Sequence, residues 1–131
     1  MAMDRPHVSE LLEAVQEFLT DKITPQLSGF DAFQMRIINN VLDIARREVT
    51  HNRACAAAET ARLQALFETE DTYLDALNRR LCTTIRKGQL PLDDPQLLAH
   101  LWASTLDKVA IDQPRYATYR REAQKRGHTL P

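Results

Sequence analysis

Large apolar side chains recur every three or four residues along most of this chain, and this spacing limits the possible folds more than any other feature. The first such series is Val8, Leu11, Leu12, Val15, Phe18, Leu19 and Ile23. Side chains three and four residues apart share one face of an α-helix, whereas a half-buried strand needs strict alternation. The sequence contains no sustained alternation and no internal repeat. We therefore predict an all-α fold: a compact bundle of about five helices with antiparallel neighbours, plus a short C-terminal helix or tail, and no β-sheet.

Residues that start and stop helices set the expected boundaries. Ser9 is the expected N-cap of the first helix, and Pro25 is expected to end it. Asn52 and Arg53 are expected to separate the second helix from the third. The later helices are expected at Phe30–His51, at Ala54–Phe67, from Glu70–Thr72 to Arg86, from Pro95 to Ile111 with Asp93 or Asp94 as cap, and, as a frayed end, from Tyr116 to Arg126. The expected core face of the second helix is Phe33, Ile37, Val41, Ile44 and Ala45.

The length of 131 residues is that of one ordinary domain. We expect residues 1–131 to form a single helical domain in which 1–7 and 117–131 are flexible. Glycine occurs only 3 times, which favours helix because glycine loses the most backbone freedom in that conformation.

The net charge and the lengths of the apolar runs restrict the binding partners and the cellular location that we expect for the protein. The formal net charge of -1 gives no overall field for a polyanion, so nucleic-acid binding is not favoured. Cys55 and Cys82 have no metal-ligand spacing and are expected to be reduced thiols that pack in helices. No signal-peptide run follows the first residues, and no apolar run could span a bilayer. We expect a cytoplasmic protein that does not enter a membrane.

The residues that usually carry chemistry do not form a site in the sequence. One Glu-x-x-His pair, Glu48 and His51, would supply only part of a carboxylate–histidine metal site, and it is expected at a helix end. The three glycines make no phosphate-binding loop, and no serine lies in a nucleophile elbow. We predict no metal, no cofactor and no catalytic residue, which favours a non-enzymatic role.

Polar residues on apolar helix faces form the first candidate site. Arg36 and Asn40 lie on the core side of the second helix, and Asp107 and Lys108 lie on the fifth, near Trp102. A buried amide or charge must be hydrogen-bonded, so these groups are expected to converge between the two helices. Structural bracing is the preferred interpretation. A ligand pocket remains the alternative, if the groups converge on an open cavity.

The C-terminal segment is the second candidate. Five residues form a possible interaction surface there: Pro114, Arg115, Tyr116, Arg120 and Arg121. Interleaved basic and aromatic side chains bind acidic protein surfaces or RNA, and with this net charge a protein partner is preferred. A solvated helix end is the simpler interpretation.

The order of short motifs resembles a bacterial family of small domains of unknown function (DUF6285). The matching stretches are Arg5–Pro6, Glu10–Val15, Phe33–Ile37, Asn40–Leu42, Arg47–Glu48, Leu77–Asn78, Leu81–Cys82, Leu97–Leu101 and Leu106–Tyr116. Members of this family tend to be encoded beside an aminoglycoside-phosphotransferase-like kinase and acyl-CoA dehydrogenases. The resemblance implies an accessory role beside such a kinase, and it assigns no catalytic residue.

Three alternative functions are consistent with these sequence features. The preferred one is a non-catalytic interaction protein that binds or regulates a phosphotransferase-like kinase. The second is a small-molecule binder or unrecognised enzyme with a pocket near Arg36, Asn40, Trp102 and Lys108. The third is a homo-oligomeric helical module, possible as a homodimer, which exposed apolar residues on the second or third helix would favour.

Overall fold

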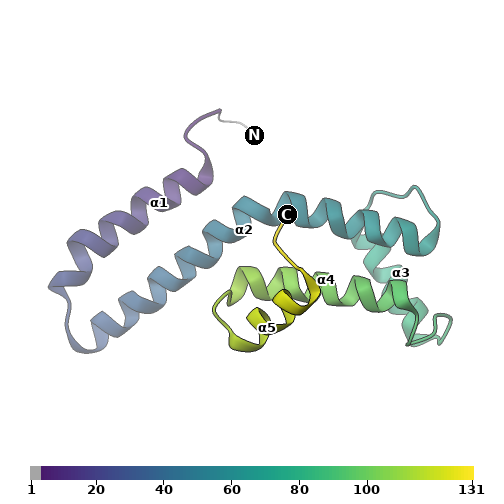
Figure 1. Cartoon of the computed structure of the whole chain (residues 1–131). Helices are drawn as coiled ribbons and strands as arrows, with labels where there is room; N and C mark the ends of the chain where they lie inside the picture. Colours follow the sequence, from purple (N-terminus) through teal and green to yellow (C-terminus); the bar gives the residue numbers. More distant parts are fainter. Residues whose placement is uncertain (1–3) are drawn as a thin grey trace. The chain divides into compact units, whose positions relative to one another are not determined.

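The computed structural model describes residues 4–131 and is all-α in that part of the chain (Figure 1). It contains no strand there, and the predicted fold class is confirmed. The five α-helices are α1 (Val8–Phe18), α2 (Gly29–Phe67), α3 (Leu74–Arg86), α4 (Pro95–Asp112) and α5 (Ala117–Arg126). A π-helical turn, η1 (Leu19–Ile23), and a 3₁₀ turn, η2 (Thr24–Gln26), connect α1 to α2. Of the residues 1–7 expected to be flexible, 1–3 lie outside the described part.

The start of α1 differs from the prediction. The N-cap is His7, not Ser9. The backbone N–H of His7 donates to Glu10 Oε2 at 2.6 Å, so a carboxylate in the first turn satisfies a backbone donor that would otherwise remain unpaired. This contact lets the helix begin before the serine.

The expected break at Asn52 and Arg53 is wrong, because α2 is one continuous helix of 39 residues. Arginine is a good helix former, and asparagine costs only a few tenths of a kcal/mol (about 0.5) relative to alanine in a helix interior. Neither residue removes a hydrogen bond or adds a clash, as a proline would. The helix ends instead where Glu68 adopts the left-handed conformation, with φ 48°.

The cap of α4 follows the prediction. Asp94 is the N-cap, and its carboxylate accepts a hydrogen bond from the backbone N–H of Leu97 at 2.8 Å. Pro95 occupies the first turn, where its missing N–H leaves no hydrogen bond unmade.

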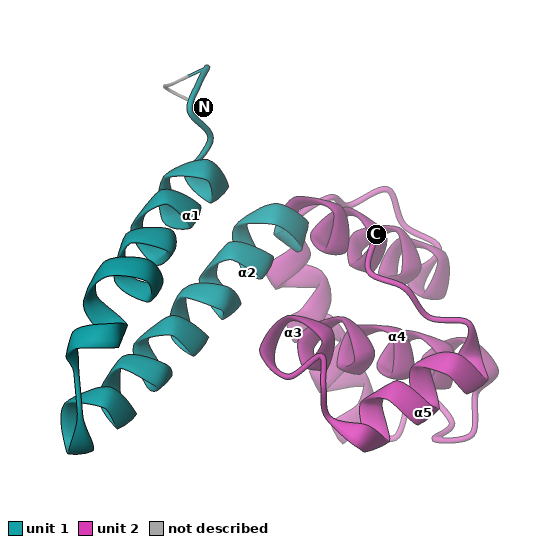
Figure 2. Ribbon diagram, turned by 60° about the vertical axis from the view of Figure 1, so that its left-hand side comes forward, with its two compact units in different colours: residues 1–52 teal, residues 53–131 magenta. Residues whose placement is uncertain are grey.

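The contacts along the chain group it into two compact units, residues 1–52 (unit 1) and 53–131 (unit 2), shown in teal and magenta in Figure 2. The helix α2 contributes residues to both. The single domain expected from the chain length stays a prediction.

Unit 2 has a leucine core. Leu63 from α2, Leu77 and Leu81 from α3, and Leu97 from α4 are buried together. Further apolar side chains pack around them: Leu66, Phe67, Leu74, Ile85 and Leu90. Burial of such side chains contributes about 1.5–3 kcal/mol each, so this cluster stabilises the unit.

Unit 1 has almost no core of its own. Helix α1 lies alongside the first part of α2 (Figures 1 and 2), and polar groups join the two. Gln16 donates to Asp43 at 2.8 Å, and Arg46 forms an ion pair with Glu13 at 2.8 Å. Among the described residues of this unit, Met35 is the one buried hydrophobic side chain. The core face expected around Phe33, Ile37 and Val41 is wrong, since these three side chains are exposed.

No helix in residues 4–131 combines the length and the apolar character that crossing a membrane requires.

Candidate functional site

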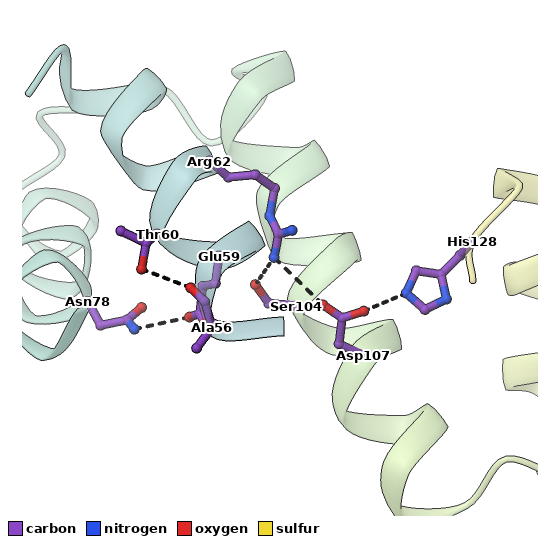
Figure 3. A network of polar contacts seen from close by, with 8 residues as sticks. All are labelled: Ala56, Glu59, Thr60, Arg62, Asn78, Ser104, Asp107 and His128. Atoms are coloured by element: carbon purple, nitrogen blue, oxygen red, sulfur yellow. Dashed lines mark hydrogen bonds and ion pairs between the residues drawn. The ribbon is translucent and has the colours of Figure 1, made fainter. Parts of the chain in front are cut away.

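A buried carboxylate in unit 2 organises the polar contacts of α4. Asp107 is 8% exposed, and His128 Nε2 donates to its Oδ1 at 2.7 Å (Figure 3). On its other side, Arg62 Nη2 lies 3.8 Å from Asp107 Oδ2 and donates to Ser104 Oγ at 3.1 Å. We call Arg62, Ser104, Asp107 and His128 the C-terminal clasp, because they join α2, α4 and the end of the chain.

The end of α5 places His128 in this clasp. Gly127 has φ 62°, and the backbone N–H of His128 donates to the carbonyl of Ala123 at 2.9 Å. The N–H of Gly127 donates to Gln124 O at 3.3 Å, which completes a Schellman cap. This cap reverses the chain direction, so that the residue after the glycine returns toward α4.

A second contact holds the same end of the chain. The guanidinium carbon of Arg126 lies 3.6 Å from the ring centroid of Trp102, the distance of a stacked cation–π pair. Tyr119 meets His128 edge-on, with 6.3 Å between the ring centroids. Residues 117–126 therefore form a helix, and Arg126 and His128 make specific side-chain contacts with α4. The flexibility expected of residues 117–131 stays a prediction.

Burial shifts two ionisable groups near the clasp. Burial lowers the pKa of His100 below its ordinary 6.5, and the positive charge of Arg62 lowers it further. Burial also raises the pKa of the Tyr119 hydroxyl, with a smaller contribution from the negative charge of Asp107. Both groups are therefore favoured in their neutral forms.

The clasp contains a serine, a histidine and an aspartate, but they are not arranged as a hydrolytic triad. In such a triad one histidine nitrogen bonds the carboxylate and the other nitrogen bonds the nucleophile. In the clasp, Nε2 of His128 bonds Asp107, so the nucleophile would have to lie at Nδ1. That atom, His128 Nδ1, is buried without a hydrogen-bond partner in the described residues, and Ser104 Oγ is bonded to Arg62 instead. The arrangement neutralises a buried carboxylate between two cationic or polar partners, which is the geometry of a structural brace.

The polar cluster expected from the sequence is divided between the two units. Arg36 and Asn40 are exposed residues of unit 1, and the Arg36 guanidinium stands 5.7 Å from the Phe33 ring centroid. Trp102 and Asp107 belong to unit 2, where Arg126 and His128 contact them. Lys108 is exposed on α4. The convergence of all five residues stays a prediction.

The residues that contact Asp107 are not among the site residues predicted from the sequence. Arg62 lies in an alanine-rich stretch and His128 in a segment expected to be flexible. The available signal was Gly127 directly after Lys125 and Arg126, which is typical of a helix C-terminus followed by a chain reversal.

The proposed interaction surface at the C-terminus is largely accessible. Tyr116 is the N-cap of α5 and is 53% exposed, and Arg115, Arg120 and Arg121 are exposed as well. Pro114 is half-buried. Basic and aromatic side chains thus stand together at the corner between α4 and α5.

Metal ligands do not gather in the described residues. No group of three or more His, Cys, Asp or Glu side chains in residues 4–131 is arranged to hold a metal ion. Glu48 and His51 lie within the continuous α2, not at a helix end as expected. The packing role expected of Cys82 is wrong, because this thiol is exposed.

Unit 1 exposes large apolar side chains along both of its helices. On α1, four exposed apolar side chains form what we call the α1 stripe: Val8, Leu11, Val15 and Phe18. On α2, four exposed apolar side chains and the half-buried Ile44 form the α2 stripe: Phe30, Phe33, Ile37, Val41 and Ile44. Their spacing of three and four residues keeps each set on one face of its helix. Contiguous exposed apolar patches of this kind mark interaction sites.

Comparison with known proteins identifies one family. The model of a family described as a domain of unknown function (DUF6285) matches residues 25–116, which include all of α2, α3 and α4. No curated protein matches, and no solved structure matches. The match carries no chemistry of its own, so any functional argument depends on the residues described above.

Proposed function

This chain belongs to the DUF6285 family, and from that premise we propose that it is a non-catalytic accessory protein that binds a partner protein through unit 1. The observation that carries the proposal is the exposure of large apolar side chains along both helices of that unit. Phe30 is 70% exposed and Phe18 is 57% exposed. Full burial of such a side chain is worth about 1.5–3 kcal/mol, so a partner's surface that covers the exposed half would recover about 1 kcal/mol for each.

The α1 stripe suits a partner with an apolar groove. Its four side chains lie at positions i, i+3, i+7 and i+10, the spacing by which an amphipathic helix anchors in a groove. The rest of α1 carries Glu10, Glu13 and Glu17. A groove with an apolar floor and a basic rim would therefore complement this helix.

The candidate partner is the phosphotransferase-like kinase that the family resemblance implies. An accessory protein of this kind needs a binding surface and no active site, and the clasp in unit 2 has the geometry of a brace. The exposed corner with Arg115 and Tyr116 offers a second surface for the same partner.

Co-expression with the kinase and affinity capture test the proposal. We expect the two proteins to co-purify, and we expect Val15→Asp to abolish capture because it places a charge in the centre of the α1 stripe. Thr20→Asp is the matched control. Thr20 is exposed but does not lie on the face that carries the α1 stripe, so this variant should retain binding. Arg115→Glu and Tyr116→Ala report on the second surface.

The outcomes separate clearly. Capture that survives Val15→Asp but is lost in Arg115→Glu moves the contact to the α4–α5 corner. Absence of association at micromolar concentrations of both proteins rejects the kinase as the partner.

A further inference from the structure

The positions of the α2 stripe are symmetric about Ile37. Its residues lie at positions 30, 33, 37, 41 and 44, so Phe33 and Val41 are equally far from Ile37, and so are Phe30 and Ile44. A twofold contact between two copies of one helix requires that when residue i meets residue j, j also meets i. In an antiparallel pair with its axis at Ile37, every apolar position of the stripe therefore lies opposite another apolar position of the stripe.

We infer that the α2 stripe binds the α2 stripe of a second copy of this chain, antiparallel, with the twofold axis at Ile37. This inference rests on the proposed function, because it names the occupant of one of the two exposed faces of unit 1. The α1 stripe remains available for the partner protein.

The sizes of the side chains agree with this pairing. In the antiparallel pair Phe33 of one copy lies beside Val41 of the other, and Phe30 lies beside Ile44. Each large ring therefore meets a smaller β-branched side chain, as interdigitating helix surfaces require. Phe30 and Phe33 are already stacked, with 6.4 Å between their centroids and 29° between their planes.

The exposed apolar area is close to what a dimer needs. The exposed parts of the stripe amount to roughly 400–500 Å² per chain, since a fully exposed aromatic side chain presents about 150–250 Å² and the aliphatic ones present less. Two copies would bury roughly 800–1,000 Å² of apolar surface, and burial of rim residues beside the stripe would bring the total above the lower limit of a specific interface, about 1,000 Å². The stripe contains no charged residue, and Gln34 and Asn40 flank it with neutral amides. Arg36 also flanks the stripe, with its guanidinium 5.7 Å from the Phe33 ring centroid, so the two copies of Arg36 lie near the axis. Their like charges oppose the pairing, and salt should screen this repulsion.

The mass of the full-length chain, measured by light scattering over a range of concentrations, tests the inference. We expect the wild type to have twice the chain mass and Ile37→Asp to have the single chain mass. Ala57→Asp, an exposed position on the same helix outside the stripe, is the matched control and should remain a dimer. A wild type that stays monomeric up to about 100 μM overturns the inference.

Cross-linking tests the register, even if Ile37→Asp does not fold. With Cys55 and Cys82 replaced, Ile37→Cys on the axis should form an intermolecular disulfide on oxidation. Phe30→Cys should not, because about 10 Å of helix separates it from the axis, so its two copies lie about 20 Å apart. Equal cross-linking of both variants contradicts the antiparallel register.

The remaining outcomes separate the two proposals. A monomeric wild type whose melting temperature falls sharply in Ile37→Asp would show that residues of the same chain cover the stripe, which overturns the dimer. Kinase capture that persists in Ile37→Asp keeps the proposed function independent of the dimer. A dimer without capture supports the inference and rejects the kinase.

Discussion

At Gly127 the backbone takes a conformation that residues with a Cβ rarely adopt, and a part-buried hydrogen bond between His128 and Asp107 depends on it. The φ of 62° closes the Schellman cap of α5 and brings His128 to Asp107. Nothing lies within 4 Å of where a Cβ would stand, so a substitution here meets no steric clash. The cost is purely conformational, about 1 kcal/mol for a side chain in the left-handed region.

Gly127→Ala should therefore lower the free energy of unfolding by about 1 kcal/mol and loosen the clasp. The fluorescence of Trp102, the one tryptophan in the chain, reports on the clasp because Arg126 stacks on its ring. Thr129→Ala, an exposed position after the cap, serves as the control and should change neither stability nor emission. An unchanged Gly127→Ala melting curve would contradict this account of the cap.

The burial of His100 should make the free energy of unfolding decrease as the pH falls. Because its pKa in the folded protein is lowered from 6.5, the unfolded chain binds more protons as the pH falls through that value. The stabilisation from the neutral imidazole is complete above pH 6.5 and is lost below it. We expect the wild-type melting temperature to fall between about pH 7 and 5.5, and His100→Gln to fall less over the same interval. Equal slopes for the two proteins would assign the pH dependence to other groups.

Among the helices, α2 has two features that its sequence does not suggest: its length and the residue at which it ends. Its 39 residues pass through Asn52 and Arg53 without a break, and it ends at a residue other than glycine. Glu68 takes φ 48°, while the N–H of Thr69 donates to Gln64 O at 3.1 Å in the same cap geometry that glycine usually supports. The end of α2 therefore carries backbone strain that a glycine would relieve.

Glu68→Gly should raise the free energy of unfolding by about 0.5–1 kcal/mol, since glycine adopts the left-handed conformation without a Cβ penalty. Glu68→Ala removes the same carboxylate but keeps the Cβ, so it should give no comparable gain. Chemical denaturation of the three proteins measures the difference. A gain shared by both variants would attribute the effect to charge instead of backbone conformation.

On the scale of the whole molecule, the two units differ in what stabilises them. Unit 2 buries a leucine cluster around Leu63 and Leu97, whereas unit 1 buries Met35 among its described hydrophobic residues and is joined by polar contacts. Surface ion pairs and hydrogen bonds of this kind contribute about 1 kcal/mol or less each. A helical hairpin with so little apolar burial is expected to be only marginally stable by itself.

The fragment 53–131 should therefore fold cooperatively alone, and the fragment 1–52 should not at low concentration. Circular dichroism during thermal melting distinguishes them. If the α2 stripe binds a second copy, the helicity of 1–52 should rise with concentration, and Ile37→Asp should remove that rise. A fragment 1–52 that melts cooperatively at every concentration would contradict this description of unit 1.

Local patterns in the sequence predict the all-α fold, the start of α4 with Asp93 or Asp94 as its cap, and the family resemblance. These follow from local chemistry: the spacing of apolar residues, the carboxylate of Asp94 and the proline after it. Local chemistry also predicted a break at Asn52, which failed because a weak propensity cannot interrupt a helix whose backbone hydrogen bonds all remain available.

Which apolar faces are buried, and which polar groups contact one another, depends on how the helices pack. The periodicity places Ile37 and Val41 on one helix face. It does not say whether that face is buried in a core or exposed to water, and here both side chains are exposed. Asp107 was a candidate from its position on α4, whereas its partners Arg62 and His128 come from distant segments. Such contacts depend on how the chain reverses after Gly127 and packs, and no periodicity along one helix encodes that.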